Sequence, residues 1–224
     1  MKKYYIQIFT IKGDTTMTNV LFIKANDRPA DQAVSSNMYE TFLNTYKEAN
    51  PNDSITELDL FAENITDYGH TAITGVFKRN QGLEVTAEEA AAADLVDQYL
   101  NQFFAADKIV MAFPLWNAMV PAPLVNYISY LAQAGRTFKY TPEGPVGLVG
   151  DKKVLLLTAR GGVYSTEPAA SNELALKFVS TNLALWGVTN PETVIIEGHN
   201  QYPDRAQEII ADGLEEVSKA AAKF

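Results

Sequence analysis

Short runs of consecutive apolar residues recur along the chain. Four of these runs are 20–23, 109–113, 154–157 and 193–196. Continuous apolar runs of this length are typical of parallel strands that are buried on both faces. A fifth run, 55–60, alternates apolar and polar residues, which favours an edge strand with one face in water. The pattern therefore predicts four interior strands and one edge strand.

Helical periodicity fills the segments between these runs. Residues 87–104 repeat apolar side chains at helical spacing, and they follow Thr86 with Glu89 three positions on, the spacing of a capping box. Further helices are predicted over 34–49, 122–133, 171–186 and in the C-terminal segment that begins near Pro203. Strict alternation of strand and helix implies right-handed crossovers. We therefore expect an α/β fold whose five-stranded parallel sheet carries helices on both faces.

Three segments fall outside this alternation. Residues 1–16 precede the first strand and are predicted to be an N-terminal extension of a domain that spans 17–224. The connection from 61 to 86 has no strong period, and unpatterned connections of this length are usually functional or mobile. The glycine-rich residues 144–150 precede a strand instead of following one, so we expect a plain loop there.

Charge and composition exclude several kinds of chemistry. The chain has 27 acidic and 18 basic side chains, and its net charge of -9 opposes binding to nucleic acid or to an anionic membrane. It has no cysteine and only two histidines, so we expect no metal site, thiol catalysis or iron–sulfur cluster. No apolar stretch approaches the ~20 residues that span a bilayer. We expect a cytoplasmic protein that relies on an organic cofactor.

Ligands of open parallel sheets bind at the carboxyl ends of the strands. After the first strand, Ser35 and Ser36 stand at the start of a helix, with neither a GxGxxG turn nor a P-loop before them. Helix amides and serine hydroxyls suit a phosphate monoester. The alternative is a plain serine N-cap without any ligand.

Two further strand ends carry candidate residues. After the third strand, Pro114 and Trp116 offer an apolar wall for a flat heteroaromatic ligand, or Trp116 simply covers the core. After the fourth strand, Gly161 and Gly162 allow a backbone to approach a ligand, and Tyr164 follows them, although an ordinary turn would look the same. A receiver domain lacks its acidic residues here, and a serine hydrolase lacks its Gly-x-Ser-x-Gly elbow.

Three motifs together resemble the FMN-dependent NADH azoreductase family. They are 113–117 (FPLWN), 134–145 (AGRTFKYTPEGP) and 159–164 (ARGGVY), and the resemblance extends from about residue 17 to the C-terminus. It implies a flavodoxin-like fold, bound FMN, NADH as co-substrate and a homodimer with each flavin at the subunit interface. Azo compounds and quinones are the acceptors that it implies.

The resemblance also assigns residues to the cofactor. Its implied FMN contacts are Asn26, Val34, Ser35, Ser36, Pro114, Leu115, Trp116, Asn117, Ala159, Arg160, Gly161, Gly162 and Tyr164. Ala25 stands where some relatives have serine, which moves any contact there to Asn26 or to the backbone. Lys78 stands where some relatives have arginine and is assigned to the substrate pocket with Tyr127 and Tyr140. We expect Trp116, Tyr127 and Tyr140 to be exposed in a monomer and covered in the dimer.

The resulting hypothesis is a ping-pong, two-electron reductase that passes a hydride from NADH through FMN to azo dyes or quinones. Such chemistry belongs to the flavin, so no ionisable catalytic side chain is required. The alternatives are a flavodoxin-like carrier of single electrons and a flavin-binding module that does not oxidise NADH. A net charge of -9 would suit a carrier that docks on a basic protein.

Overall fold

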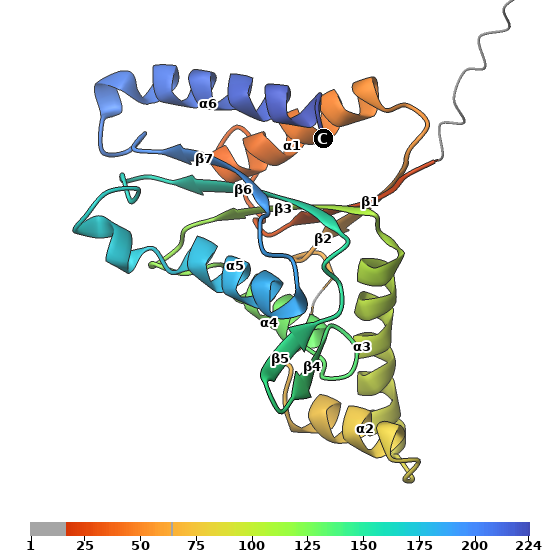
Figure 1. Cartoon of the computed structure of the whole chain (residues 1–224). Coiled ribbons are helices and arrows are strands. Elements are labelled where there is room, and N and C mark those ends of the chain that lie inside the picture. The colour runs from red at the N-terminus through yellow and green to blue at the C-terminus, as the bar shows by residue number, and fades with distance from the viewer. Residues whose placement is uncertain (1–16, 64) are drawn as a thin grey trace, which may run out of the picture.

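Five parallel strands form the central sheet of the computed structural model, which describes residues 17–63 and 65–224. Along the sheet their order is β2-β1-β3-β6-β7 (Figure 1). The strands are β1 (Asn19–Lys24), β2 (Ser54–Asp59), β3 (Lys108–Pro114), β6 (Lys153–Arg160) and β7 (Glu192–Glu197). This is the doubly wound order of flavodoxin-like folds, so the predicted fold class is confirmed. The predicted extension, residues 1–16, lies outside the described residues.

Helices cover both faces of the sheet, as predicted. Figure 1 shows α1 (Val34–Ala49) and α6 (Ala206–Ala221) together on one face. The other face carries α3 (Ala87–Ala105), α4 (Ala122–Leu131) and α5 (Ala175–Trp186). The first helical turn of α3 is closed by the predicted capping box, in which the Glu89 amide donates to Thr86 Oγ1 at 3.1 Å and the Thr86 amide donates to Glu89 Oε2 at 2.8 Å.

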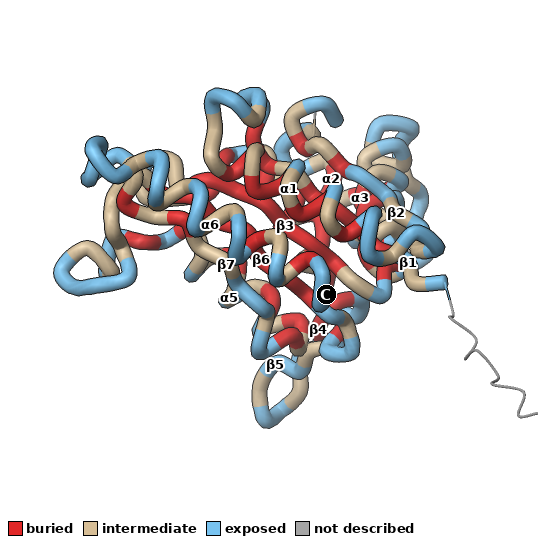
Figure 2. The backbone as a smooth tube through the Cα atoms, turned by 90° about the horizontal axis from the view of Figure 1, so that it is seen from above, coloured by how far each residue is buried: buried red, intermediate tan, exposed pale blue. Residues whose placement is uncertain are grey.

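The alternation of side chains along the strands builds a separate core on each face. Leu21 and Ile23 point toward α3 and α4, whereas Val20 and Phe22 point toward α1 and α6. All four side chains are at most 1 % exposed, which explains why the interior strands have continuous apolar runs. Figure 2 shows the buried residues concentrated along the central strands and the exposed ones in the outer loops.

One predicted interior strand is an edge strand instead. The run 193–196 belongs to β7, which pairs only with β6 among the described strands and ends the sheet. Its apolar run resembles that of an interior strand because helix α6 covers one face of β7. The two elements pack closely, since a Cβ added at Gly213 of α6 would lie 2.4 Å from Ile196 Cγ1 of β7. Burial by a helix and burial between two strands leave the same apolar signature in a sequence.

Two segments have more structure than the sequence pattern indicated. The long connection holds a helix, α2 (His70–Asn80), which packs so closely on α3 that a Cβ at Gly75 would lie 2.2 Å from the Glu89 carbonyl oxygen. The expectation of a plain loop over 144–150 is wrong for its first half. There, β5 (Gly144–Gly147) pairs with β4 (Phe138–Thr141) in an antiparallel hairpin.

The remaining helical segments are shifted or divided. The predicted helix over 171–186 is a short 3₁₀ turn, Ala169–Asn172, followed by α5 from Ala175. At Pro203 the chain makes a second 3₁₀ turn, Pro203–Arg205, before α6 begins. Within the described ranges, no helix combines the length and the apolar character that crossing a membrane requires. The same residues contain no cluster of three or more carboxylate or imidazole groups that could hold a metal ion.

Candidate functional site

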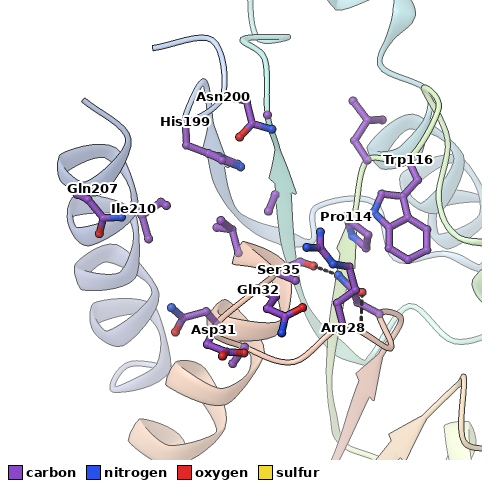
Figure 3. Close-up of a pocket in the computed structure, with 18 residues that line it drawn as sticks. Arg28, Asp31, Gln32, Ser35, Pro114, Trp116, His199, Asn200, Gln207 and Ile210 are labelled. Atoms are coloured by element: carbon purple, nitrogen blue, oxygen red, sulfur yellow. Dashed lines mark hydrogen bonds between the residues drawn. The ribbon is translucent and has the colours of Figure 1, made fainter. Parts of the chain in front are cut away.

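A cavity of about 640 Å³ opens at the carboxyl ends of the parallel strands (Figure 3). Four segments line it: the loop from β1 into α1, the end of β3, the end of β6, and the loop from β7 into α6. Of the residues predicted to contact a cofactor, Asn26, Val34, Ser35, Pro114, Leu115, Trp116, Ala159 and Gly161 lie in its wall. This is the place where open α/β sheets bind ligands, next to the reversal in strand order at β1.

The first wall is the N-terminus of helix α1. Its N-cap residue, Ala33, has an extended backbone and makes no side-chain capping hydrogen bond, and the first turn carries no acidic residue. The amides of this turn therefore keep their partial positive charge and face the cavity beside Val34 and Ser35. An uncapped N-terminus of this kind favours an anion such as a phosphate group.

The polar side chains around this turn bind one another. Asn26 Nδ2 donates to Ser35 Oγ at 2.9 Å, and Asn26 Oδ1 accepts from the Arg28 amide at 3.0 Å. Ser36 Oγ donates to the Arg28 carbonyl oxygen at 2.7 Å, and Ser36 is not among the cavity residues. Ser35 lines the cavity and Ser36 does not, because successive side chains of a helix point about 100° apart.

The second wall is the end of β3. The Leu115 amide donates to the Ala159 carbonyl oxygen at 2.9 Å, which keeps Pro114 and Leu115 beside the end of β6. Trp116 then exchanges backbone hydrogen bonds of 2.8 and 3.0 Å with Met119 across a tight turn. The two residues of that turn, Asn117 and Ala118, have φ values of 51° and 65°.

This turn is strained, and strain of that kind gathers at functional sites. Residues other than glycine seldom adopt positive φ, and each instance costs about 1–3 kcal/mol. The turn presents the half-buried indole of Trp116 to the cavity, and the Phe61 ring packs edge-on against this indole with ring centroids 6.1 Å apart. Asn117 itself is exposed and lies outside the cavity wall.

The third wall is the turn after β6, and the loop after β7 holds it in place. The Gly161 carbonyl oxygen accepts from the amides of Asn200 at 2.9 Å and Gln201 at 3.1 Å. A Cβ at Gly161 would lie 2.4 Å from Asn200 Nδ2, so a larger residue there would displace the Asn200 side chain. The Gln201 side chain adds a hydrogen bond of 2.8 Å from the Val163 amide. Neither Gly162 nor Tyr164 lines the cavity.

Arg160 turns away from the cavity. It lies opposite Glu197 in the β6–β7 register, is 4 % exposed, and its Nε lies 3.2 Å from Glu197 Oε2. Its Nη1 lies 4.0 Å from Glu173 Oε2. Glu197 Oε2 also accepts from the Tyr164 amide at 2.9 Å, and Glu173 Oε1 accepts from the Leu176 amide at 3.0 Å. The buried guanidinium thus ties the loop after β6 to the end of β7 and the start of α5.

The residues assigned to the substrate pocket do not meet in this cavity. Tyr127 is fully buried, 5.6 Å from the Tyr99 ring, and burial raises the pKa of its phenol. The expectation that Tyr127 is exposed in a monomer is therefore wrong, because that face of α4 points into the core. Lys78 lies on α2, where its ammonium contacts both carboxylate oxygens of Glu89 at 2.7 and 2.8 Å and lowers the pKa of that group. Tyr140 lies on β4 and is 75 % exposed.

Sequence reasoning missed several polar residues of the cavity. They are Arg28, Asp31, Gln32 and Asn37 near α1, and His199, Asn200 and Gln207 after β7. His199 Nδ1 is enclosed and has no hydrogen-bond partner among the described residues, and burial lowers the pKa of its imidazole. The strand-end rule would have found His199 and Asn200, since only Gly198 separates them from the end of β7.

The cavity residues fit a flavin mononucleotide. A volume of about 640 Å³ lies within the range of about 300–1,000 Å³ for cofactor pockets. The uncapped α1 N-terminus suits the phosphate, whereas Pro114 and Trp116 offer a flat apolar wall. The enclosed, unpartnered nitrogen of His199 is a polar group that a ligand could satisfy.

Comparisons with known proteins point to the same family. A family model described as a flavodoxin-like fold matches residues 18–221. A Bacillus cereus protein named FMN-dependent NADH:quinone oxidoreductase 2 is 67 % identical over 208 residues, which cover 93 % of this chain and 100 % of the relative.

Solved structures agree with this relationship. The crystal structure of an azoreductase from Bacillus anthracis strain Sterne has a TM-score of 0.90 at 60 % identity and covers 93 % of this chain and 100 % of its own. An FMN-dependent NADH-azoreductase from Bacillus anthracis strain Ames Ancestor, solved in complex with FMN, has a TM-score of 0.83 at 26 % identity, with 92 % and 99 % of the two chains covered. The predicted resemblance is confirmed: this chain belongs to the flavodoxin-like family of FMN-dependent NADH:quinone oxidoreductases and azoreductases.

Proposed function

We propose that this protein is an FMN-dependent oxidoreductase that takes electrons from NADH and reduces quinones and azo compounds. The observation that carries the proposal is the strand-end cavity, where an uncapped helix N-terminus and an aromatic wall lie at two different strand ends. When bound, FMN supplies the two-electron chemistry between nicotinamide and acceptor. The chain's own residues bind and orient the reactants.

Each wall of the cavity has a distinct task in this proposal. The α1 N-terminus, with Val34 and Ser35, binds the phosphate end of the cofactor. Pro114, Leu115 and Trp116 exclude water from one side of the ring system, and the backbone around Ala159 and Gly161 approaches its polar edge. No side chain of the cavity has to exchange a proton with the substrate, because the flavin supplies the chemistry.

We further propose a homodimer in which the partner completes each substrate pocket. Exposed apolar side chains lie on α2, among them Phe77, which is 59 % exposed. Tyr140 and Val146 of the β4–β5 hairpin are 75 % and 44 % exposed. Figure 1 shows α2 and this hairpin at the same end of the molecule. Covering them in a two-fold interface removes apolar surface from water and brings Lys78 and Tyr140 toward the partner's cavity.

The same proposal includes location and excluded partners. A net charge of -9 and the absence, in the described part of the chain, of a helix able to span a membrane support a cytoplasmic enzyme. The charge also disfavours nucleic acid as a partner. Light scattering of the purified protein should report about twice the chain mass of 24.7 kDa.

Steady-state kinetics test the proposed function directly. If nicotinamide and acceptor share one face of the cofactor, double-reciprocal plots of NADH oxidation at several quinone concentrations should be parallel. Without oxygen, NADH alone should bleach the yellow protein, and a quinone added after removal of the nucleotide should restore the colour. A yellow protein that oxidises no NADH would favour the electron carrier, and intersecting lines would contradict the shared face.

A further inference from the structure

Arg28 differs from the other arginines of the described chain. Arg79, Arg136, Arg160 and Arg205 each have a carboxylate oxygen within 4.0 Å. Arg28 lies in the loop between β1 and α1, lines the cavity, and has no carboxylate of the described residues within ion-pair distance. An unpaired guanidinium in a cofactor cavity is available to an anion.

The backbone of this exposed residue is nevertheless held by buried side chains. The Arg28 amide donates to Asn26 Oδ1 at 3.0 Å, and its carbonyl oxygen accepts from Ser36 Oγ at 2.7 Å. Asn26 is itself held by Ser35 Oγ at 2.9 Å. Asn26, Ser35 and Ser36 are at most 2 % exposed. Three buried polar residues therefore position one residue whose side chain is left unpaired.

The electrostatics of the site are incomplete without an anion. Figure 3 shows Arg28 extending across the cavity beside Ser35 and Pro114, whereas Asp31 lies toward helix α6. A guanidinium and an uncapped helix N-terminus are both positive, so placing them around one space is unfavourable unless a negative group lies between them. A dianionic phosphate monoester would satisfy both groups at once.

We propose that Arg28 binds the phosphate of FMN, and that Asn26 and Ser36, which contact its backbone directly, are positioning residues that act through Arg28. This inference rests on the proposed function, because it takes FMN as the occupant of the cavity. The α1 amides lie on one side of the phosphate, and the guanidinium closes the other side with paired N–H donors. The Ser36 hydroxyl donates its hydrogen bond to the Arg28 carbonyl oxygen, so Ser36 supports this contact without touching the phosphate.

Flavin affinities of the full-length protein, stripped of its flavin, test the contact. Quenching of flavin fluorescence gives dissociation constants for FMN and for riboflavin, which lacks the phosphate. Arg28→Ala should weaken FMN binding by about 10- to 100-fold, the loss expected for a charged hydrogen bond. It should change riboflavin binding by less than about twofold, since riboflavin makes no phosphate contact.

Controls separate this inference from its alternatives. Arg205→Ala removes the same charge from a surface pair with Glu208 and should leave FMN affinity unchanged. Equal losses for FMN and riboflavin in Arg28→Ala, or no loss for either, would overturn the inference. So would a raised KM for NADH with unchanged FMN affinity, because Arg28 would then serve the nucleotide. If the wild-type protein binds neither flavin, the proposed function fails instead.

A double-mutant cycle tests the role of Ser36. Ser36→Ala alone should weaken FMN binding, but in the Arg28→Ala background it should add less than about twofold. Additive losses would show that Ser36 contacts the phosphate itself and would overturn the positioning role. Thermal unfolding checks that Ser36→Ala folds. If Ser36→Ala does not fold, Asn26→Ser takes its place in the cycle, because the shorter serine side chain no longer reaches the Arg28 amide. A loss that is not additive with Arg28→Ala again supports the positioning role, and an additive loss overturns it.

Discussion

Replacing Arg160 by methionine should destabilise the protein strongly. The substitution keeps an unbranched side chain of similar length and removes the cation from a site that is 4 % exposed. Glu197, whose side chain is 18 % exposed, then loses a partner at 3.2 Å, and Glu173, at 8 %, loses one at 4.0 Å. Removing one member of a buried ion pair costs about 3–5 kcal/mol, because the other charge stays desolvated.

The expected loss lies near the lower end of that range. Glu197 retains some contact with water, and the 4.0 Å separation from Glu173 makes that interaction weak. We therefore expect the free energy of unfolding to fall by about 3 kcal/mol. Urea unfolding of the flavin-free protein, followed by circular dichroism and tryptophan fluorescence, measures this change.

Two variants serve as comparisons for Arg160→Met. Arg205→Met breaks an exposed pair with Glu208, whose side chains are 64 % and 57 % exposed, and should leave the urea midpoint unchanged. Adding Glu197→Gln to Arg160→Met should recover part of the loss, because it removes the uncompensated charge. A loss below about 1 kcal/mol for Arg160→Met would refute the reasoning, since such a cluster would behave as a surface pair.

Three further predictions concern packing, backbone strain and pH. Gly147→Ala places a Cβ 2.2 Å from the Gly187 backbone nitrogen, so the free energy of unfolding measured in urea should fall by about 1–3 kcal/mol. An unchanged free energy would show that the hairpin can move away from α5. Ala118→Gly removes the strain of a residue with a φ of 65°, but glycine also gives the unfolded chain more conformational entropy. The net effect should be a rise of about 0.5–1 kcal/mol in the free energy of unfolding, and a fall would contradict the strain. Burial lowers the pKa of His199, so the unfolded chain takes up its proton first as pH falls. Wild-type stability should therefore decline below about pH 7, and His199→Gln should flatten that decline when urea unfolding is measured between about pH 7.5 and 5.

Much of the fold is readable from the sequence because its signals are local or strongly periodic. Apolar runs in β1, β3 and β6 reflect burial on both faces, and the Thr86 capping box lies entirely within one helical turn. Strand order leaves no such trace, so the edge position of β7 could not be predicted.

The elements that escaped prediction depend on tertiary contacts. Helix α2 buries only Ala72 and Gly75, so no large apolar side chain marks its buried face in the sequence. Strand β5 contains two glycines and a proline, residues that disfavour strands, and it forms because β4 pairs with it and Gly147 packs closely on α5.

For the site, position along the chain was predictable but side-chain direction was not. Pro114, Trp116, Gly161 and Ser35 lie at strand ends and line the cavity. Ser36 and Arg160, each one residue from a cavity residue, point elsewhere, because a single step rotates a helical side chain by about 100° and reverses a side chain on a strand. Periodicity could place Tyr127 on α4 but could not show which face the core covers.

The cavity wall joins segments from nearly the whole length of the chain, and this has a consequence for biosynthesis. Asn26 and Ser35 are translated before β2, whereas Gln207 and Ile210 of the same wall are translated only after β7. Strand β1 must also wait for β3, since Lys24 pairs with Ala112, and pairings so distant in sequence form slowly. A nascent chain that ends before α6 therefore has no complete flavin site. Binding of flavin to the complete site therefore follows the synthesis of β7 and the first turns of α6.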